Sequence, residues 1–366
     1  MGQNGSRRSC RSLYFALAVV VFFALFVYTP LPDRYEDQRS ALVQQVADAA
    51  KHPHVQAPEI IETASLATTR SKYAFATFLA GDANVQEDIE VDHDNYFVAT
   101  RILAYQLLHA PETKSDNIPF IVLVTANVTE AKRERLRKDG AIVHEAEHVP
   151  KPDWIVTETS TWQDVFDKLR LWELTQFERI AFLDGDTILT RPLDGIFNDS
   201  AVLTQPTLSK QTEPSPAEAP LPPSYVFAGT PEMNSPHHYP PSEATNDYPN
   251  INYLNAGFFV LQPSLDLLAY YLSLMQIPDR FHAKLPEQNL LNEAHRREGN
   301  MPWKQLGPEW NIHYPTVEDL EGGVATLHEK WWAPVDKALE PYLRSWRWRM
   351  EGFYEARDAM RARLET

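Results

Sequence analysis

Apolar and polar positions divide the chain into two unlike parts. Residues 13–28 form one uncharged apolar run, LYFALAVVVFFALFVY, and a proline-containing segment ends it. Residues 32–70 are polar and charged without a sustained hydrophobic period, which is typical of a stem. From residue 71 onward short apolar runs recur between polar stretches. We therefore expect the ordered domain at 71–335 and a helical extension, rich in Trp and Arg, at 336–366.

The ordered part alternates predicted strands with predicted helices. Short apolar runs predict strands at 73–79, 120–125, 141–144, 179–183, 255–261 and 325–328. Helical spacing or clustered helix-forming residues predict helices at 96–108, 129–138, 161–174, 264–275 and 286–296. Alternation of this kind predicts an α/β domain with a mostly parallel central sheet. In such sheets ligands bind at the carboxyl ends of the strands.

Prolines interrupt the alternation at residues 206–250. Proline removes a backbone donor and blocks regular elements. A loop longer than about 15 residues in a compact domain is usually functional or disordered. Two interpretations stay open for this insertion: a loop that faces an acceptor, with His237, His238 and Tyr239 in it, or a tolerated surface insertion.

Charge and cysteine content narrow the class of protein. The formal net charge is −16, and an acidic surface repels phosphate backbones, so we expect no nucleic-acid partner. An acidic protein still binds an anionic nucleotide when a divalent cation lies between them. Cys10 is the single cysteine of the sequence, which excludes an intramolecular disulfide.

The apolar run near the start predicts a membrane anchor. A spanning helix needs about 20 apolar residues, with a lower limit near 17, and the segment 13–31 reaches that limit. Arginines precede it, so the positive-inside rule places a tail at 1–12 in the cytosol and the rest of the chain in the lumen. The alternative is a cleaved signal peptide, but no small-residue cleavage site follows Tyr28.

The strongest local motif for chemistry is Asp184-Gly185-Asp186. It directly follows the predicted strand at 179–183. Two carboxylates separated by one residue on a turn converge on one divalent ion, and Mg²⁺ or Mn²⁺ prefers such oxygen ligands while leaving positions open for substrate phosphates. The alternative is a solvated turn or a helix cap, because acidic pairs are common in turns.

Three blocks resemble the glycogenin-type family 8 glycosyltransferases. They are FDKLRLWELTQF at 166–177, IAFLDGDT at 180–187 and NAGFFVLQPS at 255–264. The resemblance covers about residues 72–335. It implies a GT-A fold, in which a Rossmann-like domain binds a nucleotide sugar with Mn²⁺, and transfer of the sugar with retention of its anomeric configuration.

The resemblance also implies roles for particular residues. Asp184 and Asp186 match the metal-binding pair, and His328 matches a third ligand, although a lone histidine is more often structural. The residues that match the donor-nucleotide site are Phe75, Thr77, Phe78, Tyr96, Lys168 and Lys330. Lys330 departs from the family pattern, which has a glycine and a longer gap before the lysine. The residues that match the site of the transferred sugar are Asn255, Glu287 and Gln288; Glu287 stands where the family has aspartate.

These features together predict a type II Golgi membrane enzyme, or one of the ER, with a lumenal catalytic domain. The acidic pair, the short anchor and the proline-rich insertion are similar to fungal family 8 members grouped with Golgi N-acetylglucosaminyltransferases. The expected reaction transfers GlcNAc or glucose from a UDP-sugar to a glycan, with Mn²⁺ or Mg²⁺. The alternatives are a self-glucosylating enzyme like glycogenin and an inactive protein that binds nucleotide sugars.

Overall fold

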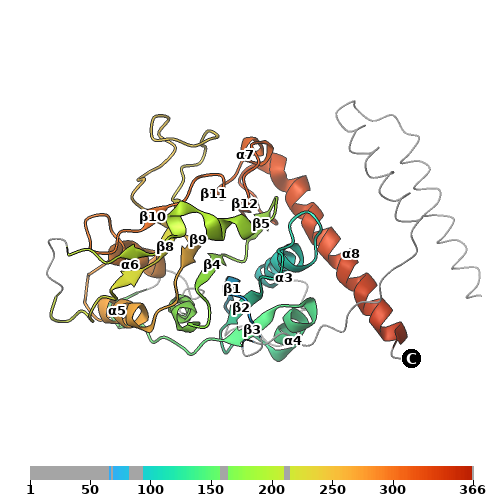
Figure 1. Cartoon of the computed structure of the whole chain (residues 1–366). Helices are drawn as coiled ribbons and strands as arrows, with labels where there is room; N and C mark the ends of the chain where they lie inside the picture. The colour runs from blue at the N-terminus through green and yellow to red at the C-terminus, as the bar shows by residue number, and fades with distance from the viewer. Residues whose placement is uncertain (1–65, 67–68, 82–93, 157–163, 210–214, 365–366) are drawn as a thin grey trace, which may run out of the picture. The chain divides into compact units, whose positions relative to one another are not determined.

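The computed structural model describes residue 66 and residues 69–81, 94–156, 164–209 and 215–364 (Figure 1). The chain divides into units 1–61 and 62–366, and the fold below belongs to the second. The predicted tail, anchor and most of the stem lie outside the described residues. Within the part that is described, no helix is both long and apolar enough to cross a membrane.

Seven strands form the central sheet, in the order β10–β8–β9–β4–β1–β2–β3. Their bounds are β1 (Tyr73–Leu79), β2 (Phe120–Val124), β3 (Ile142–Glu145), β4 (Arg179–Leu183), β8 (Phe227–Pro231), β9 (Leu254–Leu261) and β10 (Lys304–Gln305). β9 runs antiparallel to β4 and β8, and every other neighbouring pair is parallel. This confirms the predicted α/β fold with a mostly parallel sheet.

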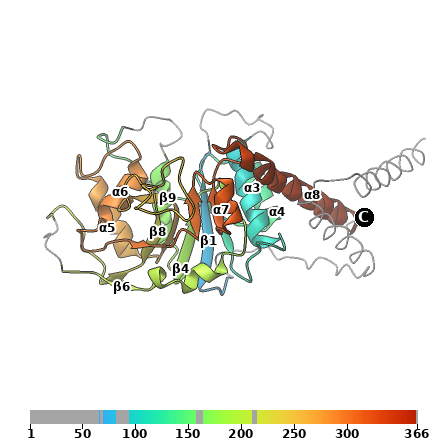
Figure 2. The same ribbon diagram turned by 90° about the horizontal axis from the view of Figure 1, so that it is seen from above.

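The sheet is covered on both faces, which explains why its strands are almost continuously apolar. All residues of β2 and β9 are buried. Successive side chains of β1 enter two different hydrophobic clusters: Ala74 and Ala76 the first, Phe75 and Leu79 the second. Figure 2 shows α5 and α6 on one side of the sheet and α3, α4 and α8 on the other.

Four of the five helices predicted within the domain are present as α-helices, and three of them begin at a capping side chain. They are α3 (Asn95–Leu108), α4 (Glu130–Asp139), α5 (Leu265–Met275) and α6 (Pro286–Ala294). Thr129 caps α4 and Ser264 caps α5, each accepting a backbone N–H of the first turn. Gly140 ends α4 at φ 107°, a left-handed conformation that favours glycine.

The segment predicted as a helix at 161–174 is instead the 3₁₀-helix η4 (Val165–Glu173). Six of its residues are buried, including Asp167 and Lys168, and they contact the rest of the domain on more than one side. An amphipathic α-helix needs one apolar face. The segment 165–173 is instead buried on several sides, so its apolar residues do not mark a single helical face.

A second, three-stranded sheet carries the chain back to the carboxyl edge of β4. Its order is β11 (Asn311–His313), β12 (Thr326–His328) and β5 (Thr187–Leu189). The short helix α7 (Val317–Glu321) lies between β11 and β12 in the chain. The C-terminal helix α8 (Glu340–Leu364) packs against α3 and buries Leu343, Trp346, Met350 and Tyr354. The remaining elements are η5 (Asp194–Asn198), η6 (Ser200–Val202), β6 (Gln205–Pro206), β7 (Ser224–Tyr225) and η7 (Lys337–Leu339).

The sequence predicted that the proline-rich stretch 206–250 interrupts the sheet, but the structure places a strand in it. β8 lies within it, is fully buried and pairs with β9 and β10. The run from 224 to 230 contains no proline, and the short strand fits there. The loop that follows β8 packs against α7. His237 Nε2 lies 3.0 Å from Asp319 Oδ2 at the start of α7, and both side chains are fully buried.

Candidate active site

The turn after β4 fixes the two aspartates in place. The Asp184 N–H donates to the Gly257 carbonyl of β9 at 2.8 Å, and the Thr187 N–H closes the turn onto the Asp184 carbonyl at 3.1 Å. The Asp186 carbonyl accepts the Glu329 N–H at 3.0 Å. The turn is therefore bound to β9 on one side and to the end of β12 on the other.

His328 reaches the same point from the end of β12. Its Nε2 lies 3.3 Å from Asp186 Oδ1 and 3.7 Å from Asp184 Oδ2. The imidazole fits because residue 257 is glycine: a Cβ there would stand 2.1 Å from His328 Cε1. No side chain is tolerated at that distance, so Gly257 provides the space that the ring occupies.

The three residues form a donor set suited to a divalent cation. One ligand atom from each of Asp184, Asp186 and His328 lies within 4.8 Å of the other two. Ligands about 2.1 Å from one ion are separated by roughly 3–4 Å, so this spacing fits Mg²⁺ or Mn²⁺. Burial disfavours the charged forms of Asp186 and His328, but the pairing of the two side chains outweighs burial. The pairing lowers the pKa of Asp186 and raises that of His328, which favours a proton on the imidazole. A bound cation would take the place of that proton.

Lys168 joins this cluster to a buried carboxylate. Its Nζ lies 3.3 Å from Asp184 Oδ1, 3.4 Å from Glu287 Oε2 and 3.5 Å from the Ala256 carbonyl. Burial lowers the pKa of Lys168, but the charges of Asp184 and Glu287 outweigh it and raise the pKa above its usual value. Lys168 therefore holds the two carboxylates together in a site where they would otherwise repel each other.

Glu287 stands in an environment that favours its neutral form. The side chain is buried in the first turn of α6, and its Oε1 has no hydrogen-bond partner among the described residues. Burial raises the pKa of Glu287 to about 7, although Lys168 lowers it. A carboxyl group that titrates near neutrality in such a place is typical of a functional site.

Asn255 and Gln288 extend the polar site along the start of β9. Asn255 Nδ2 donates to Glu232 Oε2 at 2.9 Å, and its Oδ1 accepts the Gly257 N–H at 2.9 Å. Gln288 Oε1 accepts the Ala256 N–H at 2.9 Å. The structure thus brings Asn255, Glu287 and Gln288 to one wall of the site. This wall lies beside Asp184, Asp186 and His328, the three residues called the cation cluster below.

Two residues of this wall escaped the sequence analysis. Glu232 Oε1 lies 2.5 Å from His313 Nδ1, and the His313 ring stacks on His328 at a centroid distance of 4.7 Å. Burial raises the pKa of Glu232, but His313 and Asn255 outweigh it and lower the pKa to about 2. Glu232 follows Pro231 at the end of β8, so recognising that strand within the proline-rich stretch would have pointed to it.

Only some of the residues expected at the nucleotide lie beside the cation cluster. Tyr96 is half exposed and meets the edge of Trp332 at 5.1 Å, another residue that sequence reasoning missed. Burial raises the pKa of Tyr96, and nearby Lys330 lowers it, which places Lys330 close to the phenol. Thr77 Oγ1 is buried within β1 and has no hydrogen-bond partner in the described chain.

The two phenylalanines of β1 that were expected at the nucleotide lie away from Tyr96 and Lys330. Phe75 is fully buried and packs on Phe197 at 5.4 Å, so its side chain belongs to the core. Phe78 is partly buried against the cluster on the opposite face of the sheet. The structure thus brings Tyr96 and Lys330 to the cation cluster but directs the Phe75 and Phe78 side chains into packing.

A family model described as "Glycosyl transferase family 8" matches residues 91–330. The chain belongs to glycosyl transferase family 8. The match contains every residue of the cation cluster together with Lys168 and Glu287. As a family 8 glycosyltransferase, the protein transfers a sugar from a nucleotide sugar.

Proteins similar to this chain include fungal and plant proteins. One uncharacterized protein of Schizosaccharomyces pombe is 29% identical over 286 residues, which cover 70% of this chain and 74% of the relative. A second is 31% identical over 273 residues, which cover 66% and 69%. Galactinol synthase 10 of Arabidopsis thaliana is 24% identical over 288 residues, which cover 71% and 78%.

Solved structures of glycosyltransferases are also similar to this chain. The galactosyltransferase LgtC, solved in complex with donor and acceptor sugar analogs, aligns with 75% of this chain and 95% of its own, at a TM-score of 0.43 and 16% identity. Mouse xyloside xylosyltransferase 1 aligns with 72% and 99%, at a TM-score of 0.45 and 14% identity.

Proposed function

We propose that this glycosyltransferase is a retaining, Mn²⁺-dependent enzyme that transfers GlcNAc or glucose from a UDP-sugar to a glycan acceptor. The observation that carries the proposal is the meeting of Asp184, Asp186 and His328 at the carboxyl edge of β4. Two carboxylates and an imidazole form the mixed oxygen and nitrogen set that suits Mn²⁺, with coordination positions left for phosphate oxygens.

The residues around the cluster divide into two sides. Asp184, Asp186 and His328 would hold the cation, which supplies charge neutralisation for a diphosphate leaving group. Lys330 lies beside Tyr96 and adds a second cation for the diphosphate. The exposed Tyr96 ring offers a face on which a uracil base stacks, and Trp332 fixes that ring from its edge.

The opposite side suits the transferred sugar. Glu287, Gln288, Asn255 and Glu232 supply oxygen acceptors and amide donors within one hydrogen-bonded wall. Such groups fix sugar hydroxyls and stabilise the positive charge that develops on the sugar ring during transfer. Retention is proposed from the family resemblance, and ¹H NMR of the first-formed anomer tests it.

Localisation is part of the proposal. The apolar segment 13–31 and the arginines before it support a type II anchor in the Golgi membrane, with the catalytic domain in the lumen. Protease protection of intact vesicles tests this topology. A lumenal domain resists the protease until detergent is added, whereas a cytosolic domain is cleaved at once.

A donor screen tests the activity. The full chain in detergent is incubated with Mn²⁺ and, separately, UDP-GlcNAc, UDP-glucose, UDP-galactose and GDP-mannose, and release of nucleoside diphosphate is recorded. We expect turnover of UDP-GlcNAc or UDP-glucose that the Asp184→Ala/Asp186→Ala variant abolishes. Equal release by the variant, or turnover of GDP-mannose alone, would refute the proposal.

A second candidate is galactinol formation. It is favoured by the similarity to galactinol synthase 10, which extends over 71% of this chain. Turnover of UDP-galactose in the same screen, with galactinol as the product by mass spectrometry and NMR, would replace the GlcNAc or glucose proposal.

A further inference from the structure

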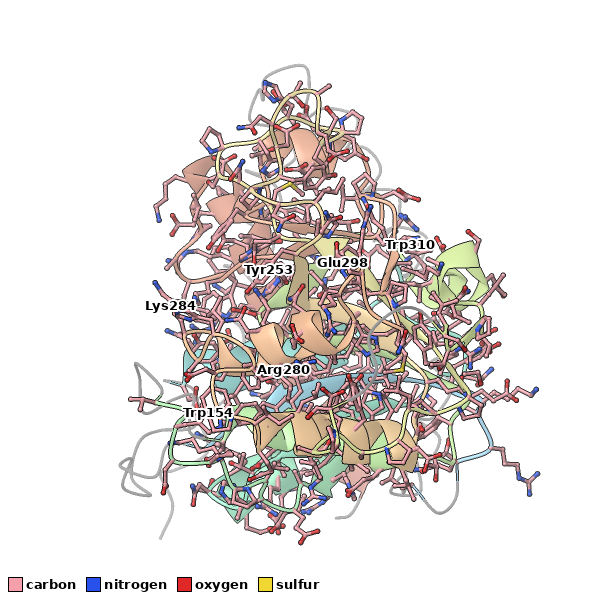
Figure 3. All side chains as sticks on the ribbon, turned by 90° about the vertical axis from the view of Figure 1, so that its left-hand side faces the viewer. Trp154, Tyr253, Arg280, Lys284, Glu298 and Trp310 are labelled. Atoms are coloured by element: carbon pink, nitrogen blue, oxygen red, sulfur yellow. The ribbon has the colours of Figure 1, made fainter. Side chains whose placement is uncertain are left out.

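A polar groove lies beside the proposed transfer site. It is open to solvent and has a volume of about 380 Å³, between the segment before β9 and the residues around α6, and Tyr253 and Glu298 both line it. Figure 3 faces this side of the molecule and labels both residues above α6. The groove is distinct from the cation cluster, because Asp184, Asp186 and His328 do not line it.

The lining of the groove is rich in carboxamides and rings. Four asparagines contribute, at positions 250, 252, 289 and 292, together with the rings of Tyr253, Phe281 and His282. A carboxamide both donates and accepts hydrogen bonds, which matches a sugar hydroxyl that does the same. Aromatic rings offer flat apolar surface with polar edges, which suits the C–H faces of a pyranose.

The charges of the groove cancel, so the lining favours a neutral ligand over an anionic one. Arg296 Nη1 lies 2.7 Å from Glu293 Oε1. Arg280 also contacts Glu293, at 3.0 Å, and pairs with Glu218, so these two arginines face two carboxylates. Arg297 and Glu298 are adjacent in sequence, are both exposed and carry opposite charges. A phosphate or nucleotide would find no excess positive charge here.

Some of these polar groups form hydrogen bonds within the protein that fix the shape of the groove, and others are available to bind a ligand. Asn292 binds the Leu254 N–H and carbonyl at 2.8 and 2.9 Å, and Asn289 Nδ2 donates to the His282 carbonyl at 2.7 Å. His282 Nδ1 accepts the Lys284 N–H at 3.1 Å, so in the neutral ring Nε2 carries the proton and stays available as a donor. Asn252 and His282 are exposed at the rim.

A short hydrogen-bond path connects the groove to the sugar side of the transfer site. The Tyr253 hydroxyl donates to Asn289 Oδ1 at 2.6 Å and accepts from Gln288 Nε2 at 3.1 Å. Gln288 also approaches Glu232 Oε2 at 3.5 Å, beside Asn255. Adjacent residues of α6 thus serve both sites, Glu287 and Gln288 the transfer site and Asn289 the groove.

We propose that this groove binds a neutral oligosaccharide, namely the part of the acceptor glycan that is remote from the hydroxyl receiving the new sugar. The inference rests on the proposed glycan-directed activity and adds a second region of acceptor contact. A long acceptor then binds at both places, and a monosaccharide binds only at the transfer site. The groove makes the enzyme select acceptors by length.

Calorimetric binding to the full chain in detergent tests this proposal. The probes are maltotetraose, chitotetraose and mannotetraose with their three monosaccharides, and UDP with Mn²⁺ is titrated into the same samples. We expect one tetrasaccharide to bind the wild type and to bind Asn252→Ala/His282→Ala at least about tenfold more weakly, the effect of losing one or two hydrogen bonds. Gln276→Ala, an exposed amide outside the groove, is the matched control.

The outcomes separate the groove from the activity. Tetrasaccharide binding that the double variant weakens, with UDP affinity unchanged, supports the groove. If UDP binds but no tetrasaccharide does, or if the double variant binds it as the wild type does, the groove proposal is overturned and the proposed activity stands. If UDP itself fails to bind, the proposed activity falls as well.

Discussion

At the scale of single residues, the site depends on close packing around His328. The imidazole touches the backbone of Gly257 on one side and stacks on His313 on the other. Its Nδ1 has no hydrogen-bond partner within the described ranges, although histidines that bind metals usually donate that N–H to an acceptor. Ring packing, rather than a hydrogen bond, therefore orients this side chain.

Gly257→Ala tests that dependence. The new Cβ would stand 2.1 Å from His328 Cε1 and 2.9 Å from Asn255 Oδ1, so the imidazole must leave its position. We expect Mn²⁺ affinity and turnover to fall at least tenfold, because one of three protein ligands is displaced. Manganese titration followed by electron paramagnetic resonance measures the affinity. Wild-type affinity in a folded Gly257→Ala protein would show that His328 is not a ligand.

Glu232→Gln tests the pair that sequence reasoning missed. The substitution keeps the side-chain size but removes the charge that binds His313 and Asn255. A hydrogen bond to a charged group contributes about 1.5–3 kcal/mol, so we expect kcat to fall roughly 10–100-fold. UDP affinity should stay unchanged, because Glu232 lies on the side proposed for the transferred sugar. An equal loss of UDP affinity would place it at the nucleotide instead.

His295 gives a prediction about the pH dependence of stability. Its ring is fully buried: Nδ1 lies 2.7 Å from the Met301 carbonyl, to which it donates, and Nε2 lies 2.6 Å from the Tyr271 hydroxyl, from which it accepts. Burial lowers the pKa of His295 to about 3. The unfolded chain, with a pKa near 6.5, then binds the proton first. Stability is complete above about pH 6.5 and is lost as the pH falls toward 3.

Urea denaturation from pH 7.5 to pH 4.5 measures this effect. We expect wild type to lose up to about 1.4 kcal/mol per pH unit below 6.5 more than His295→Gln, which has no titrating ring. Parallel pH profiles of the two proteins would contradict the assignment of a neutral, buried His295.

At the scale of elements, sequence reasoning succeeded where an element is defined by its own pattern. β1, β2, β4 and β9 are apolar runs, and α4 and α5 begin at residues that cap them. It failed for β5 and β11, which have three residues each and are defined by pairing with β12. Such strands carry too few residues to show a period, so tertiary contacts alone determine them.

The site divides in the same way. The acidic pair after β4 was visible as a motif, whereas the roles of His328, Lys168 and Asn255 required the family resemblance. Glu232, His313 and Trp332 were missed because they lie outside any local pattern and reach the site only through β8, β11 and the segment after β12. No spacing rule connects residues brought together by strand pairing across a sheet.

The loop after β8 gives the prediction at this scale. His237 and Asp319 form a buried pair that connects this loop to α7. Removing one partner of a buried pair costs about 3–5 kcal/mol, so Asp319→Ala should lower the free energy of unfolding by that amount. Limited proteolysis should then cut within 232–250. Asp266→Ala, at an exposed carboxylate of α5, is the control and should change neither measurement.

At the scale of the whole molecule, negative charge gives the proposed cation its role. The chain carries a formal net charge of −16, and the carboxylates of Asp184, Asp186 and Glu232 lie around the stacked rings of His328 and His313. A nucleotide diphosphate would be repelled by such a surface. Lys168 already pairs with two carboxylates, whereas Lys330 lies beside Tyr96. A cation bound by Asp184, Asp186 and His328 would add the further positive charge that a diphosphate requires.

Equilibrium binding of UDP with and without Mn²⁺ tests this cation dependence most directly. The wild-type chain and Asp186→Asn, which keeps the shape of the turn but removes one ligand charge, are titrated with UDP in EDTA and then in excess Mn²⁺. We expect Mn²⁺ to strengthen UDP binding at least tenfold in the wild type, about 1.4 kcal/mol, and to have little effect in Asp186→Asn. UDP affinity that is the same with and without Mn²⁺ in the wild type would contradict a cation held by Asp184, Asp186 and His328.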